Sequence, residues 1–147
     1  MTKSSLPIET IHQIRDQCLC LATQRAARRL ARRFDRAFAP LGLTNGQFSL
    51  MMALSGRWQP RLGELAEFLA MDPATLTAAV KTLERRGLVR LRPDEADARA
   101  RRPELTEAGR ETVALAVPIW KAEHGALSRE LGPDVAAGLV QGLGQLG

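Results

Sequence analysis

The chain has 147 residues, the length of one ordinary domain, which excludes a core domain plus a separate catalytic domain. Hydrophobic residues make up 45% and charged residues 25%, a balance typical of a globular protein rather than of collagen or a disordered chain. The net charge is +5, with 18 Arg against 3 Lys, so we expect a polyanionic partner, either nucleic acid or a membrane surface.

The two cysteines, Cys18 and Cys20, are only two positions apart, which excludes a disulfide framework. The N-terminal segment has no apolar core between a basic start and a small-residue cleavage site, so it does not resemble a secretory signal. The longest apolar-rich run, residues 48–54, is too short to cross a bilayer. We therefore expect a cytoplasmic protein with no membrane partner.

A long amphipathic helix is predicted first, over residues 8–39. Its apolar side chains recur at spacings near three and four, the period of one helical face: Ile8, Ile11, Ile14, Cys18, Leu21, Leu30, Phe34 and Phe38. Its other faces carry Arg25, Arg28, Arg29, Arg32, Arg33 and Arg36. This arginine run favours a solvent-exposed face or salt bridges between subunits, with contact to DNA phosphates as the alternative. A helix this long with one apolar stripe needs a partner to cover it.

Two short helices and a tight turn are predicted next. Thr44 and Gln47 form a capping box before an apolar segment, and residues 57–60 interrupt the helical pattern. A short helix from Leu62 is followed by a turn at residues 71–72, where Asp72 is a good N-cap. The next helix has Pro73 at its first position, buries Leu76, Val80 and Leu83, and ends at Gly87.

After Gly87 the periodicity changes from helix to strand. Residues 88–92 are predicted to be one strand, residues 93–98 an acidic turn, and residues 99–105 the returning strand. Thr106 then caps a helix with Glu107 in its first turn, bent at Pro118, and a last helix covers residues 135–146. The order of elements from residue 62 to residue 105 is that of a winged helix-turn-helix, in a mainly α chain with a small β-wing.

A winged helix-turn-helix suits DNA because its second helix fits the major groove, about 12 Å wide. The face of that helix opposite the buried stripe is predicted to contact base edges and phosphates: Thr75, Thr77, Ala78, Lys81, Thr82 and Arg85. The hairpin tip carries Arg99, Arg101 and Arg102, which suit the minor groove or the backbone. Residues 85–102 hold seven Arg against three acids, so this edge is the basic part of a nearly neutral segment.

Several motifs, in order, make the chain similar to the MarR (multiple antibiotic resistance) family of transcriptional regulators. They are Leu41-Gly42-Leu43-Thr44, Thr75-Leu76-Thr77, Leu83-Glu84-Arg85-Arg86-Gly87-Leu88-Val89, Asp97-Ala98-Arg99 and Leu105-Thr106-Glu107-Ala108-Gly109. By this resemblance Arg99 is the wing arginine that reaches the minor groove, and Asp97 braces the wing through an arginine pair. Ala78, Lys81 and Ala98 depart from the family's usual residues, which leaves the operator sequence open.

The resemblance also implies a homodimer, with residues 1–42 and 111–147 as a helical dimerisation region and residues 43–110 as the DNA-binding lobe. Such a dimer presents two recognition helices to a pseudo-palindromic operator in double-stranded DNA. We expect a repressor that a small aromatic or phenolic effector releases. The family's effector pocket lies between the dimer helices and the DNA-binding lobe, and Trp120 is a candidate lining residue, although a core position remains the more common role of such a side chain.

For the cysteines and histidines, a purely structural role is the alternative to a functional one. Cys20 matches the reactive position of the family's peroxide-sensing branch, but that branch uses tyrosines near its thiol and this chain has none. Cys18 continues the apolar stripe, and two residues apart on a helix the thiols point to roughly opposite faces. His12 and His124 lie too far apart for a local metal site, so we expect no metal, no cofactor and no enzymatic activity. The rival class is a protein-interaction module built on a degenerate winged helix.

Overall fold

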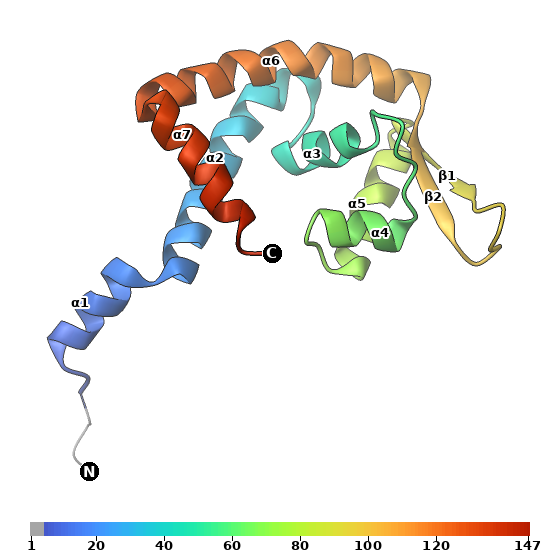
Figure 1. The fold of residues 1–147 in the computed structure, drawn as a ribbon. Helices are drawn as coiled ribbons and strands as arrows, with labels where there is room; N and C mark the ends of the chain where they lie inside the picture. The colour runs from blue at the N-terminus through green and yellow to red at the C-terminus, as the bar shows by residue number, and fades with distance from the viewer. Residues whose placement is uncertain (1–4) are drawn as a thin grey trace. The chain divides into compact units, whose positions relative to one another are not determined.

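The structure, a computed structural model, describes residues 5–147 and is mainly helical with one small antiparallel sheet (Figure 1). Its elements are α1 Ile8–Gln17, α2 Leu19–Phe38, the 3-10 turn η1 Ala39–Leu41, α3 Asn45–Ala53, α4 Leu62–Phe68, α5 Pro73–Arg85, β1 Val89–Pro93, β2 Arg101–Leu105, α6 Glu107–Leu131 and α7 Pro133–Gly144. This order confirms the expected fold class, a mainly α chain with a small β-wing after a helix-turn-helix. Within residues 5–147, no helix is both long and apolar enough to cross a membrane.

The described residues form two compact units, one that ends at residue 33 and one of residues 34–147, with the boundary inside α2. In the first unit the predicted long helix is interrupted at one residue. Cys18 is extended, with ψ 111°, although its N–H still donates to Ile14 and its carbonyl accepts from Ala22. No glycine or proline marks this break, so nothing in the local sequence predicted it. α1 has no buried residue, and Ile8, Ile11 and Ile14 are all exposed.

The second unit contains one apolar core, built where α3, α4, α5 and the hairpin meet. Phe38 and Phe48 stack with ring centroids 4.6 Å apart. Met51, Leu65 and Leu76 have no exposed surface. Burying each such side chain stabilises the fold by about 1.5–3 kcal/mol. The start of α6 belongs to the same core, because Val113 and Ala116 are buried in it.

The helix-turn-helix is shaped by its local sequence. The Asp72 carboxylate accepts the backbone N–H groups of Ala74 at 3.1 Å and Thr75 at 3.4 Å, which caps α5 as expected. The turn before it places Ala70 at φ 53°, the left-handed region that glycine usually occupies. Gly87 ends α5 at φ 73°, and β1 begins two residues later.

Candidate nucleic-acid interface

Helix α5 separates its residues into a buried and an exposed face. Leu76, Val80 and Leu83 have no exposed surface and fix the helix on the core. Of the residues predicted to contact DNA, Thr75, Ala78, Lys81 and Arg85 are exposed, and Thr77 and Thr82 are half-buried. The six therefore lie on the outer side of a rigid helix, which is the arrangement that insertion into a groove requires.

Two of these side chains are engaged with the helix itself. The Thr82 hydroxyl donates to the Ala78 carbonyl at 3.0 Å, and Arg85 Nη2 donates to Thr82 Oγ1 at 3.2 Å. Lys81 has no side-chain hydrogen bond or ion pair among the described residues. Among the described residues Lys81 is therefore a cation on this face without a partner, and the Arg85 side chain is oriented by its bond to Thr82.

The wing is a two-stranded hairpin, with Val89 opposite Leu105 and Arg92 opposite Arg102. Arg99 lies in the connecting loop, where its backbone N–H donates to Asp97 Oδ1 at 2.9 Å. Arg101 begins β2 and is exposed. Neither guanidinium has a partner within residues 5–147, so both are available to an anion outside the chain.

The carboxylate that braces the wing is Asp94 rather than Asp97. Asp94 is only 7% exposed, and its two oxygens accept from Arg102 Nε at 2.6 Å and from Arg61 Nη2 at 2.9 Å. It also accepts the backbone N–H of Asp97 at 3.1 Å. The arginine pair expected at Asp97 is not seen among the described residues: its exposed side chain accepts the Arg99 backbone N–H, and the buried Asp94 accepts from the two arginines.

Arg102 is consequently an internal residue of the lobe. Besides Asp94, it donates through Nη1 to the Gln59 carbonyl, in the loop before α4. Its side chain is 26% exposed. Because both contacts hold the guanidinium against the protein, Arg102 differs from Arg99 and Arg101, with which the sequence grouped it.

The arginines around Asp94 change its acidity. The hydrogen bond from Arg102 is the main cause that lowers the pKa of this carboxyl below its ordinary value. The positive charges of Arg102 and Arg61 and the Asp97 N–H act in the same direction, and desolvation opposes them. Asp94 therefore stays ionised at neutral pH. The sequence missed Arg61 and Gln59 because they lie 33 and 43 positions from their partners, Asp94 and Arg102.

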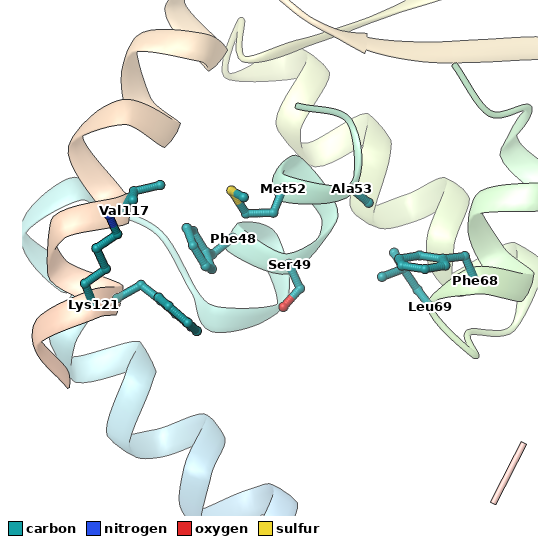
Figure 2. A pocket seen from close by; sticks show the side chains of 9 residues that line it. Phe48, Ser49, Met52, Ala53, Phe68, Leu69, Val117 and Lys121 are labelled. Atoms are coloured by element: carbon teal, nitrogen blue, oxygen red, sulfur yellow. The ribbon is translucent and has the colours of Figure 1, made fainter. Parts of the chain in front are cut away.

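A cavity of about 510 Å³ lies behind the helix-turn-helix, between α3, α4 and α6. Figure 2 shows Phe48 and Met52 of α3 between Phe68 of α4 and Lys121 of α6. The complete lining is Phe48, Ser49, Met52, Ala53, Phe68, Leu69, Val117, Trp120 and Lys121. Trp120 is thus a lining residue of a mainly apolar cavity in which the Lys121 side chain is the charged member. Its ring also stacks on that of His124, with centroids 4.7 Å apart.

The two cysteines are among neither the predicted DNA-contacting residues nor the residues that line the cavity. Cys20 is exposed and Cys18 is half-buried at the break between α1 and α2. Because Cys18 is extended, the helical geometry that was expected to separate the two thiols does not apply at this point. Within residues 5–147, no group of three or more His, Cys, Asp or Glu side chains could hold a metal ion.

Comparison with known proteins gives consistent matches. The model of the MarR family matches residues 43–100, which include α4, α5 and most of the wing. The HTH-type transcriptional repressor NicR of Pseudomonas putida is 32% identical over 118 residues, covering 80% of this chain and 74% of NicR. The transcriptional activatory protein BadR of Rhodopseudomonas palustris is 35% identical over 94 residues, and that match spans only 54% of BadR.

Solved structures match over nearly the whole chain. The Mycobacterium tuberculosis regulator MosR, in complex with DNA, is similar with a TM-score of 0.77 and 39% identity, over 88% of this chain and 96% of MosR. The transcriptional repressor CouR, bound to a 23-mer DNA duplex, is similar with a TM-score of 0.81 and 28% identity, over 97% of this chain and 99% of CouR.

Proposed function

We propose that this chain, which belongs to the MarR family of DNA-binding transcriptional regulators and is not an enzyme, is a homodimeric repressor. The dimer binds a pseudo-palindromic operator, and a small aromatic ligand releases it. The observation that carries the proposal is that two outward-facing surfaces lie on the same lobe. These are the exposed face of α5 and the guanidiniums of Arg99 and Arg101, which have no partner among the described residues. The first reads base edges in the major groove, and the second enters the adjacent minor groove or contacts the backbone.

Exposed apolar helix faces support a homodimer with the terminal helices as its interface. α7 has no buried residue, and Val135, Leu139 and Val140 are each more than half exposed. α1 has the same character. An amphipathic helix owes most of its stability to burial of its apolar face, so these faces need a partner. A second copy covers them and sets the two α5 helices about one DNA turn, ~34–36 Å, apart.

The experiment on operator binding uses the DNA upstream of the chain's own gene. We expect a salt-sensitive gel shift, a footprint with two half-sites about one turn apart, and a dimer by sedimentation velocity. A single half-site bound by a monomer would contradict the proposal. Equal affinity for the upstream DNA and for an unrelated duplex would contradict sequence-specific regulation.

Names of relatives favour repression. NicR and CouR, which match over 74% and 99% of their own lengths, are both called repressors, whereas BadR, called an activatory protein, matches over 54%. A reporter placed behind the operator tests the sign. We expect deletion of the regulator to raise reporter expression, and a fall would indicate activation.

The cavity behind the helix-turn-helix supports an aromatic effector. Its volume of about 510 Å³ lies within the usual range of small-molecule sites, ~300–1,000 Å³. The rings of Phe48, Phe68 and Trp120 suit stacking, and the ammonium of Lys121 favours a ligand that carries a negative charge, such as an acidic phenol or an aromatic carboxylate. A ligand between α6 and the lobe favours dimers whose α5 helices no longer match successive major grooves.

Tryptophan fluorescence tests the effector site. In a Trp58→Phe background the emission comes from Trp120, and we expect it to change on titration with an aromatic carboxylate and less with the corresponding neutral amide. Lys121→Gln should remove this preference for the anion. An unchanged spectrum with every aromatic acid, together with undiminished operator binding, would contradict an effector site at this cavity.

Oxidation of Cys20 is the second candidate signal, since its thiol is exposed on α2. We propose ligand release in preference, because the chain has no tyrosine to place near the thiol. Operator binding by the wild type and by Cys20→Ser, measured before and after peroxide, separates the two. Loss of binding in the wild type alone would establish oxidation as the signal.

A further inference from the structure

Five exposed arginines lie on one face of α2, and the first four of them are close together. Arg25, Arg28, Arg29 and Arg32 follow the spacing i, i+3, i+4, i+7, which places them within about 100° of one another around the helix and within about 10 Å along it. All four side chains are exposed. We call this set the α2 basic stripe.

The α2 basic stripe has no paired counter-charge within residues 5–147. None of its guanidiniums has a hydrogen bond or ion pair among the described residues. Elsewhere several arginines are paired with acids: Arg61 and Arg102 with Asp94, Arg90 with Glu104, and Arg110 with Glu107. Among the described residues, the wing arginines proposed to contact DNA, Arg99 and Arg101, also lack partners, as do Arg57 and Arg129. Like charges three or four residues apart on a helix repel one another and destabilise it. A bound polyanion would relieve this repulsion between the arginines of the stripe.

The terminal helices of a second copy, which are proposed above as the subunit interface, offer too few acids to neutralise the stripe. On α1, α2, α6 and α7, the described acidic side chains without a hydrogen bond or ion pair are Glu9, Glu111 and Asp134. Glu123 and Glu130 already have partners. Duplex DNA carries one charge per ~1.7 Å of its axis with both strands counted, so a length of ~10 Å carries about six phosphate charges, about three of them on each strand. Charge complementarity therefore favours duplex DNA.

We propose that the α2 basic stripe is a second DNA contact, which binds backbone phosphates and does not read sequence. It supplies part of the affinity and of the salt dependence, while α5 and the wing supply specificity. Binding of arginine to phosphate releases counterions, so the removal of one arginine–phosphate pair lowers the slope of log Kd against log salt by ~0.9.

The test compares two double variants with equal loss of charge. Arg28→Gln/Arg32→Gln removes neighbouring members of the stripe, and Arg57→Gln/Arg129→Gln removes two exposed arginines that have no bond among the described residues. Dissociation constants for the full chain are measured by fluorescence anisotropy on its footprinted operator and on an unrelated duplex of equal length, from about 50 to 200 mM salt. Sedimentation velocity gives the oligomeric state of each variant, and circular dichroism its fold.

We expect the stripe variant to lose about 1–2 units of slope on both duplexes and to keep its preference for the operator, while the control keeps the wild-type slope. An unchanged slope in the folded stripe variant would overturn the inference. An equal decrease in the control would also overturn it, because net charge alone would then explain the effect. A weaker dimer with an unchanged slope would assign the stripe to the subunit interface instead. Salt-dependent binding by the wild type is the reference, so failure of operator recognition itself is detected separately.

Discussion

Gly109 lies where α6 meets the start of the wing, and its replacement by alanine tests how tightly this junction is packed. A Cβ at this position would lie 2.1 Å from the Leu88 carbonyl oxygen and 3.1 Å from its carbon. The same carbonyl accepts the Thr106 N–H at 3.1 Å, and the Thr106 hydroxyl donates to the Gly87 carbonyl at 2.6 Å. The obstacle is backbone, so the strand and the helix must move apart by about 1 Å.

The expected change in the free energy of unfolding on Gly109→Ala is the sum of three contributions. Overpacking of a core costs about 1–3 kcal/mol. Stretching the two bonds made by Thr106 costs about 0.5–1.5 kcal/mol each. The better helix propensity of alanine returns about 1 kcal/mol. We therefore expect Gly109→Ala to lower the free energy of unfolding by about 3 kcal/mol, and Tm by roughly 6–12 °C.

Urea and thermal denaturation followed by circular dichroism measure the effect. The matched control is Gly125→Ala in the same helix, where the added Cβ would meet only the flexible end of Arg129, at 3.4 Å. We expect this control to be neutral or to gain up to about 1 kcal/mol. Helix propensity alone predicts the same gain at position 109. A Gly109→Ala protein at least as stable as the wild type would therefore refute the close approach as the reason for glycine here.

Three further predictions concern the DNA-binding lobe. Arg99→Ala should weaken binding to all duplexes and reduce the salt slope by about one, and an unchanged slope in a salt titration would remove Arg99 from the phosphate contacts. Lys81→Ala should change the profile of DNA fragments selected from a random pool more than it changes non-specific affinity, which an identical profile would contradict. Asp94→Asn should destabilise the protein at neutral pH. Because the folded-state pKa of Asp94 lies below its ordinary value of ~3.9, the stabilisation is complete above that value and is lost as the pH falls through the folded-state pKa. The difference in unfolding free energy between the two proteins, measured with urea at neutral pH and near pH 3, should therefore shrink in acid; a constant difference would contradict this role.

Local sequence was sufficient to predict those structural features that depend on neighbouring residues. The Asp72 cap, Pro73 at the first helical position and Gly87 at the end predicted α5, and the structure has it at Pro73–Arg85. The buried stripe followed from the same helical period, so periodicity alone separated Leu76 and Val80 from Thr75 and Lys81. Residues 105–109 contained the signal for the start of α6, although the reason for glycine at position 109 is a backbone contact with Leu88.

The hairpin arginines have contacts that the local sequence did not predict. Sequence placed Arg99, Arg101 and Arg102 together at the hairpin tip as three equivalent cations. The strand register turns Arg102 toward Asp94 and Gln59, whereas Arg99 and Arg101 keep their guanidiniums free of partners among the described residues. The resemblance placed the bracing acid at Asp97, three residues from the carboxylate that is buried.

The sequence by itself therefore determined the helix-turn-helix, the wing and the polarity of the recognition helix, because caps, turns and periodicity act over a few residues. Tertiary structure decided which acid braces the wing, which arginines remain free and where a cavity forms beside Trp120. Those properties depend on burial and on distances between residues about 30 to 70 positions apart, such as Arg61 and Asp94 or Phe48 and Trp120. An ion pair between residues so far apart in the sequence forms only where packing brings the partners together, here around an Asp94 side chain that is 5% exposed.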